Sequence, residues 1–131
     1  IDYVDSTGKT IRKWRAGMYN AGSFKWGWMP PHPSFYARAH LFKQYGAYNT
    51  DYGTAADYEL MLRFIYFNKA STYYIHRVMV KMQTGGASNQ TIMRRIRAWQ
   101  DDYRAMKKYK LPAPFFSLIL KPLRKISQYL T

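Results

Sequence analysis

The chain has 131 residues, of which 47% are apolar and 18% aromatic, so it can form one folded domain but is too short for two. It has no cysteine, which excludes disulfides, thiolate metal sites and a cysteine nucleophile. Its 21 Lys and Arg against 7 Asp and Glu give a net charge of +14, which favours an anionic membrane, nucleic acid or a phosphate-bearing substrate as partner.

Two short strands and a turn are predicted at the start of the chain. β-favouring residues alternate over 1–5 and 10–15, and Gly8 lies between them, which indicates a hairpin. Residues 17–33 are rich in Gly, Pro, Asn and aromatic residues without a regular period, so we expect a long ordered loop of the kind that carries function. Because the sequence starts abruptly inside a predicted strand, we expect a fragment of a longer protein.

A short strand followed by a short helix is predicted next. The aromatic residues of 34–38 favour the strand, and the helix is expected over 39–45, where Gly46 ends it. A turn is expected over 49–53.

A helix predicted over 55–68 carries the strongest candidate site. Apolar residues recur along it near helical spacing, and Asp57 and Glu59 fall in its first turn, where the helix dipole favours acids. An acid at this place is held at the end of a rigid element, where a substrate can reach its carboxylate. The alternative is that Asp57 only caps the helix or complements its dipole.

His32 is a second candidate, because the prolines around it in Pro30–Ser34 restrict its backbone. A fixed histidine suits a positioned hydrogen-bond donor, although one histidine without a partner is often structural. The histidines at 32, 40 and 76 are not spaced as zinc ligands and the acids are scattered. We therefore predict no metal site in this chain.

A strand over 71–83 and a basic helix after it are predicted next. The segment 84–89 breaks the chain, and Ser88 or Asn89 is expected to cap the helix, which runs to about Lys110. The glycine pair in this segment is compatible with closure over a phosphate at the helix N-terminus, and equally with a plain turn between strand and helix.

A second basic helix is predicted over about 115–130, with a kink at Pro122. From Arg77 onward, 12 of the 21 basic residues face only two acids, so this part of the chain is the predicted anion-facing surface. The longest apolar stretch, 111–120, is too short to cross a bilayer.

Three segments, in their order along the chain, resemble the acceptor half of bacterial family 2 glycosyltransferases: PPHPSFYAR, LFKQYGAYNTDYGTAADYELMLRF and MQTGGASN. In that family a Pro-His segment precedes a strand, a short helix ends in Tyr-Gly, and an acid-Asp pair opens a helix ending in Leu-x-x-Arg. The resemblance implies part of a GT-A fold, which is α/β as a whole and α+β as an isolated piece. We expect a short mixed sheet with an N-terminal hairpin and about four helices.

The resemblance also implies one unit over 1–131, in which 1–90 forms the acceptor and catalytic-base region and 91–131 the basic C-terminal helices. The second acid of the family's pair is its catalytic base, and that role corresponds to Asp57, whereas Ala56 replaces the first acid. The implied reaction is inverting transfer of a sugar from a nucleotide-sugar donor to a glycan or lipid-linked acceptor. The Q-x-x-R-W sequence of processive members is missing, which disfavours a polymerase.

The donor side of such an enzyme is not expected within this chain, because no Asp-x-Asp occurs in it. The family uses that motif to hold a divalent metal, Mn or Mg, and the diphosphate of the sugar nucleotide. We therefore expect the chain alone to bind no metal and to be inactive. Gly85, Gly86 and Ser88 correspond to a mobile segment near the donor phosphates.

The acceptor is expected at His32, Trp26, Trp28 and Glu59, since aromatic faces suit the apolar faces of pyranose rings. The basic C-terminal helices suit peripheral docking on an anionic cytoplasmic membrane face, where lipid-linked acceptors reside. Without its donor half, the chain is expected to expose a sheet edge and an apolar face and to form dimers or larger assemblies.

The alternative function is a non-enzymatic nucleic-acid-binding module, which the charge of +14 and the interleaved aromatic residues would suit. That alternative leaves the acid-bearing helix and the His-Pro loop unexplained, and the basic residues follow no groove-reading motif.

Overall fold

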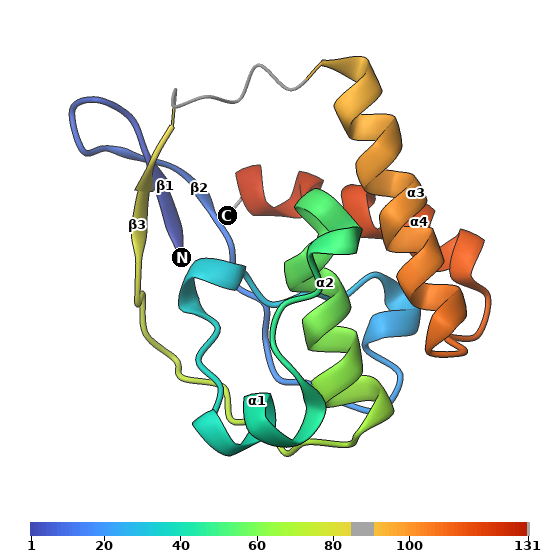
Figure 1. The fold of residues 1–131 in the computed structure, drawn as a ribbon. Helices are drawn as coiled ribbons and strands as arrows, with labels where there is room; N and C mark the ends of the chain where they lie inside the picture. The colour runs from blue at the N-terminus through green and yellow to red at the C-terminus, as the bar shows by residue number, and fades with distance from the viewer. Residues whose placement is uncertain (85–90, 131) are drawn as a thin grey trace.

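The computed structural model of the chain describes residues 1–84 and 91–130 and has an α+β fold. Figure 1 shows a small sheet on one side, the helix α2 near the centre and the long helix α3 on the other side. The predicted fold class, with a short mixed sheet, an N-terminal hairpin and four α-helices among the described residues, is confirmed.

The sheet has the strand order β2-β1-β3. The first two strands lie at the start of the chain, and the third lies about 70 residues later, at 81–83. β1 (Asp2–Val4) pairs antiparallel with β2 (Thr10–Lys13) and parallel with β3 (Lys81–Gln83). The hairpin turn uses Gly8, whose φ of 85° lies in the left-handed region that glycine adopts without strain.

The segment 17–38 is ordered, although it contains no strand. It forms two 3₁₀ turns, η1 (Phe24–Trp26) and η2 (His32–Ser34), and Phe24 is fully buried in the core. The strand predicted over 34–38 is wrong, because the extended backbone there has no neighbouring strand among the described residues. The helix predicted after it is α1 (Ala39–Tyr45), with Gly46 at its C-terminal end as expected.

The central helix begins after a 3₁₀ segment, η3 (Thr50–Ala55), and continues as α2 (Ala56–Met61) and a π-helical turn, η4 (Leu62–Phe67). The helix predicted over 55–68 is therefore present, with a wider turn in its second half. Its buried side chains form the centre of the core, and burying each large apolar side chain contributes about 1.5–3 kcal/mol. The largest of them are Tyr58, Leu60, Met61, Leu62 and Phe64.

The strand predicted over 71–83 is wrong for most of its length, because only β3 pairs with another strand. Residues 71–80 run along the surface with mostly exposed side chains, and Tyr73 is 90% exposed. β-favouring side chains did not produce a strand where the fold offers no adjacent strand.

Two α-helices follow. α3 (Ile92–Lys108) is capped by Thr91, whose side chain accepts a hydrogen bond from the backbone N–H of Arg94. The predicted caps, Ser88 and Asn89, precede this start and lie outside the described residues.

The final helix, α4 (Pro114–Leu123), contains Pro122 in its last turn, and a 3₁₀ turn, η5 (Ile126–Tyr129), follows. The single helix predicted over 115–130 therefore ends early as an α-helix, at Leu123, and the chain continues through a turn into η5. Within the described ranges, no helix has the length and apolar character needed to cross a membrane.

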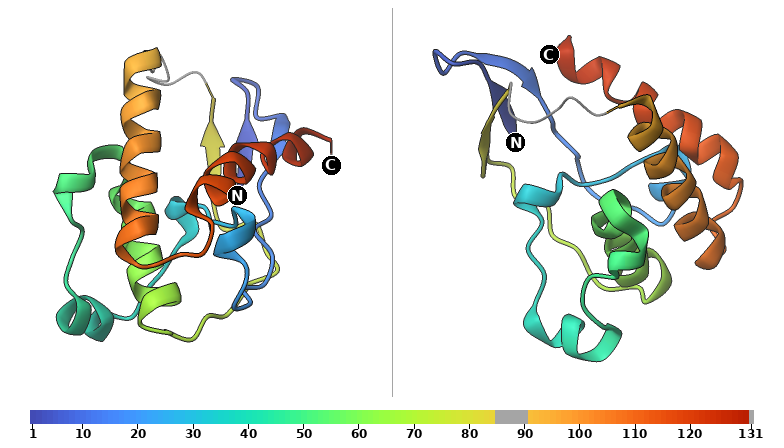
Figure 2. Two further views of the ribbon diagram at one scale, coloured as in Figure 1. Left: turned by 90° about the vertical axis from the view of Figure 1, so that its right-hand side faces the viewer. Right: turned by 45° about the horizontal axis from the view of Figure 1, so that its top comes forward.

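The C-terminal helices close the fold. α3 packs on α2, and α4 packs on α3 and η1 (Figure 2). The chain then returns to the sheet, where Arg12 of β2 donates two hydrogen bonds to the side-chain oxygen of Gln128, one of them 2.8 Å long.

Candidate functional site

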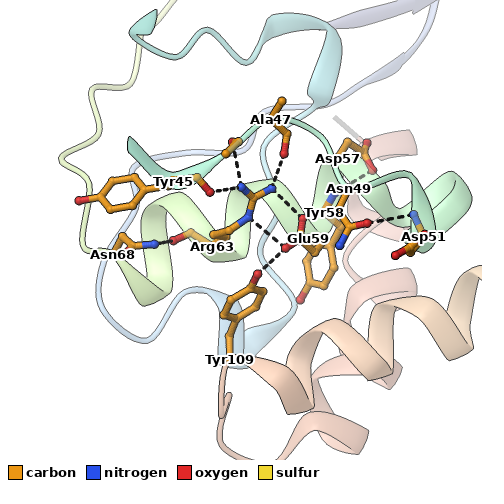
Figure 3. Close-up of polar contacts among 11 residues, drawn as sticks. Tyr45, Ala47, Asn49, Asp51, Asp57, Tyr58, Glu59, Arg63, Asn68 and Tyr109 are labelled. Atoms are coloured by element: carbon orange, nitrogen blue, oxygen red, sulfur yellow. Dashed lines mark hydrogen bonds and ion pairs between the residues drawn. The ribbon is translucent and has the colours of Figure 1, made fainter. Parts of the chain in front are cut away.

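Asp57 lies in the first turn of α2, and its side chain is 22% exposed. Its Oδ1 atom accepts a hydrogen bond of 2.8 Å from the backbone N–H of Tyr58, the next residue of the helix (Figure 3). A carboxylate at this place complements the unpaired N–H groups of the helix N-terminus. Asp57 is thus held in one orientation with its second oxygen directed away from this bond.

That second oxygen meets His32. The Nδ1 atom of His32 lies 3.2 Å from Oδ2 of Asp57, and 58% of the His32 side chain is exposed. The ring is positioned by η2, which starts at His32 between Pro31 and Pro33, and Pro31 has a fixed φ of −66°. Two residues that the sequence singled out independently are therefore in contact in the structure.

Both residues line a cavity of about 680 Å³. Its walls come from distant parts of the chain: the start of the sheet, the loop after η1, the first turn of α2, one face of α3, and the end of α4 with η5. A cavity of this size is in the range that holds a small organic ligand. The apolar and polar side chains that line it besides this pair include Tyr3, Trp14, Thr54, Ala98 and Gln128.

One wall of the cavity is basic. Lys121 donates a hydrogen bond of 2.6 Å to Asp102, and its ammonium lies 3.5 Å from the centre of the Tyr58 ring. Burial raises the pKa of Asp102, and the charge of Lys121 partly reverses this rise. Arg15 lines the cavity beside them and forms an ion pair of 2.6 Å with Asp2.

The sequence analysis missed this basic wall, since it assigned the cations of the last helices to a membrane-facing surface. The spacing of the residues in this segment does indicate which face of the helix carries the cations. Lys121 and Lys125 are four residues apart and lie opposite the row of apolar residues on the same segment, so they share a different face.

Glu59 lies elsewhere, in the buried network that Figure 3 shows. Its carboxylate accepts hydrogen bonds of 3.0 Å from Nε and Nη2 of Arg63 and a third from the hydroxyl of Tyr109. Arg63 also donates to the backbone oxygens of 45–47, at 2.8 Å for Gly46. Glu59 lines neither large cavity, so we assign it a structural role in place of the expected acceptor contact.

The two tryptophans expected at the acceptor lie in different environments. Trp28 is only 6% exposed, donates a 2.9 Å hydrogen bond to the backbone oxygen of Ala16 and lines the cavity as part of the core. Trp26 is 54% exposed, contacts the ring of Phe116 on α4 and does not line the cavity. Only Trp28 is therefore placed beside Asp57 and His32.

A second cavity, of about 540 Å³, lies on the other side of Trp28. The two cavities share the wall formed by Trp14, Arg15, Ala16 and Trp28. The second one is rich in aromatic side chains, among them Phe35, Tyr36, Tyr73 and Tyr74.

The remaining expectations concern phosphate and metal. Gly85, Gly86 and Ser88 lie outside the described residues. The resemblance implies a divalent metal in the complete enzyme, but within 1–84 and 91–130 no three His, Cys, Asp or Glu side chains are grouped as metal ligands. The residues present do not fit a metal, and we derive no step through one.

Comparison of the chain with family models, with curated proteins and with solved structures finds no match.

Proposed function

We propose that this chain forms the acceptor side of an inverting, family 2 type glycosyltransferase in which Asp57 is the general base. The observation that carries the proposal is the fixed Asp57 carboxylate, which lines a ligand-sized cavity in contact with His32. The order of the sequence motifs around these two residues supports the same function.

In the proposed reaction, the acceptor binds with one hydroxyl beside Asp57. The carboxylate takes the hydroxyl proton while the acceptor oxygen forms a bond to the anomeric carbon of the donor sugar. The bond from that carbon to the diphosphate breaks at the same time, and the diphosphate leaves with the electron pair. Attack from the face opposite the leaving group inverts the anomeric configuration.

The geometry leaves Asp57 able to act in this way. Each carboxylate oxygen has two lone pairs, so Oδ1 can accept from Tyr58 and Oδ2 can face His32 while one position on each oxygen remains for the acceptor hydroxyl. His32 is a positioning residue in this scheme, because it contacts the carboxylate that takes the proton.

The aromatic walls near this site suit a carbohydrate acceptor. Trp28 lies between the two cavities, and the second cavity continues into a group of tyrosine and phenylalanine side chains. Such rings can cover the apolar faces of sugar rings while backbone groups hydrogen-bond to their hydroxyls.

The test uses the complete product of the gene that encodes this chain, since the donor site is expected on further sequence. Asp57→Asn keeps the size of the side chain and removes its basicity. We expect turnover of a sugar nucleotide to fall by about 10²–10⁴-fold, with donor affinity unchanged.

The matched control is Asp51→Asn, which neutralises an exposed acid that lines neither large cavity. Turnover of this variant should equal that of the parent protein. Full turnover in Asp57→Asn would remove Asp57 from the role of base.

A further inference from the structure

Positive charge is concentrated in the cavity that contains Asp57. Of the four Lys and Arg side chains that line it, Arg15 and Lys121 have acidic partners. The other two, Arg124 and Lys125, form no ion pair within the part of the chain that the structure describes. The cavity therefore has cations in excess of the acids around them.

These cations are close enough to disfavour one another. Partial loss of water around the Lys125 amine lowers its pKa, and the charges of Lys121, Arg12 and Arg95 lower it further, while Asp102 opposes them. Crowding of like charges costs free energy in the empty site, and a bound anion would relieve it.

The α4 backbone that carries Lys121 is closely packed. The backbone of α4 at Lys121 lies very close to Gly27. A Cβ atom added at Gly27 would be 2.6 Å from the backbone nitrogen of Lys121. The oxygen of the Gln128 side chain is held by Arg12, which leaves its amide nitrogen as a further donor on the cavity wall. Lys121 is itself held by its hydrogen bond to Asp102, and donors held in position before a ligand arrives bind it at a lower entropic cost.

We propose that Lys121, Arg124 and Lys125 form a phosphate-binding subsite in the cavity that contains Asp57. Phosphate groups carry up to two charges each and several acceptor oxygens, which matches one guanidinium and two ammonium groups better than a single carboxylate or chloride does. At about 680 Å³ the cavity also has room for the organic group to which the phosphate is attached.

Two kinds of molecule could supply the phosphate that binds at this subsite. If the proposed glycosyl transfer holds, the phosphate belongs either to the diphosphate that leaves from the donor or to a phosphorylated, lipid-linked acceptor. The existence of the subsite rests on the cavity and its cations, and only the identity of the source rests on the proposed function.

The first experiment is titration calorimetry of the 131-residue chain with inorganic pyrophosphate, without metal, at an ionic strength of about 0.15 M. We expect saturable binding with one site per chain. Arg124→Gln combined with Lys125→Gln should weaken it by about tenfold or more, because two charge-assisted contacts are removed.

The matched control combines Lys43→Gln with Arg94→Gln, which lowers the net charge by the same two units at exposed positions that do not line the cavity. Its affinity for pyrophosphate should stay within about twofold of the parent chain, as expected for distant exposed charges. The absence of pyrophosphate binding, or equal weakening in both double variants, would overturn the proposal. Circular dichroism of all variants establishes that each is folded.

Two further classes of ligand distinguish the sources. Tighter binding of UDP or GDP than of geranyl diphosphate assigns the subsite to the donor diphosphate, and the reverse order assigns it to a lipid-linked acceptor. Equal affinity for all these ligands and pyrophosphate means that the subsite contacts the phosphates alone, which also supports it.

Asp57→Asn separates the subsite from the proposed reaction. Removal of this negative charge should leave pyrophosphate binding equal or slightly tighter, whether or not Asp57 is a base. Loss of turnover in that variant without any pyrophosphate binding by the chain would reject the subsite and keep the proposed function.

Discussion

His32 Nδ1 lies 3.2 Å from Asp57 Oδ2, although the two residues are 25 positions apart in the sequence. If His32 orients Asp57, then His32→Ala in the complete enzyme should lower kcat by about tenfold to a hundredfold with little change in KM, since misplacement of a catalytic group mainly raises the barrier. His32→Asn places an amide near the position of Nδ1 and should recover much of the loss.

His76→Ala is the control, because His76 is exposed and lines neither large cavity. Steady-state kinetics over a range of pH provide the readout. If His32→Asn is as inactive as His32→Ala, the imidazole itself transfers a proton, and a positioning role is wrong.

Glu59→Gln should destabilise the fold strongly. The change leaves the Arg63 guanidinium, which is largely buried, without its charged partner, and breaking a buried pair in this way costs about 3–5 kcal/mol. The comparison is Asp101→Asn, which breaks the partly exposed pair with Arg104 and should cost about 0–1 kcal/mol. Urea unfolding of both variants measures the difference, and equal losses would contradict the assigned structural role.

Tyr109 should make stability fall at alkaline pH. Burial, and then the hydrogen bond to Glu59, raise the pKa of Tyr109 above its usual value of 10.0, so the folded state holds this proton more tightly than the unfolded state. The resulting stabilisation is complete below about pH 10 and is lost as the pH rises toward the higher pKa of the folded state.

Tyr109→Phe should therefore reduce the free energy of unfolding by about 1–3 kcal/mol at neutral pH and should flatten its decline above about pH 10. Tyr103→Phe, on the helix α3 that Tyr109 follows, is the control and should follow the parent chain. Denaturant unfolding at several pH values tests this, and identical alkaline slopes for parent and Tyr109→Phe would show that the hydroxyl is not linked to stability.

Gly27→Ala should displace α4. Gly27 has a φ of 74°, and the added Cβ would lie 2.6 Å from the backbone nitrogen of Lys121. Gly17→Ala is a close control, since Gly17 has a φ of 75° but no atom within 4 Å of the added carbon. We expect about 1–2 kcal/mol of destabilisation at Gly17 from the backbone alone, and about 1–3 kcal/mol more at Gly27 from overpacking.

The same pair of variants tests the basic wall. Pyrophosphate binding should weaken in Gly27→Ala and stay unchanged in Gly17→Ala. Equal stability and equal binding in both would mean that α4 does not depend on the contact with Gly27.

The outer face of α4 and η5 is suited to a lipid surface. Six apolar residues at helical spacing along this segment are 42–81% exposed: Phe115, Phe116, Ile119, Leu123, Ile126 and Leu130. Together with the net charge of +14, this row is typical of a segment that binds an anionic interface. We expect the chain to sediment with anionic vesicles and not with neutral ones.

Ile119→Ser combined with Leu123→Ser should reduce vesicle binding, whereas Ile75→Ser combined with Val78→Ser, at similarly exposed positions, should not. Equal binding to neutral and anionic vesicles would rule out the electrostatic contribution. The alternative outcome is a chain that binds neither kind of vesicle but forms dimers, and whose dimers dissociate when Ile119 and Leu123 are changed. In that case a second copy of the chain covers this apolar row.

Local patterns predicted the elements that depend on nearby residues. Gly8 marked the hairpin, Gly46 marked the end of α1, and the apolar spacing from Leu60 to Phe64 marked the central helix. Each of these features depends on the backbone conformations open to glycine or on the period of the apolar residues. A few consecutive residues are enough to determine either one.

Tertiary relationships were not predictable in the same way. Residues 71–80 have β-favouring side chains, but a strand also needs a neighbour, and composition does not supply one. The contact of His32 with Asp57 and the approach of Lys121 to the same cavity depend on how distant segments pack. One error was avoidable: residues two apart on a helix point about 200° apart, so Asp57 and Glu59 cannot both face one site.

The cavity that contains Asp57 is bounded by residues from both ends of the chain, with Tyr3 on one side and Gln128 on another. A ligand bound there therefore recognises only the completely folded chain, so its binding free energy adds directly to the free energy of unfolding. At a hundred times the dissociation constant, this linkage amounts to about 2.7 kcal/mol. Thermal melting in the presence of candidate ligands thus offers a search for the natural one that requires no catalytic assay.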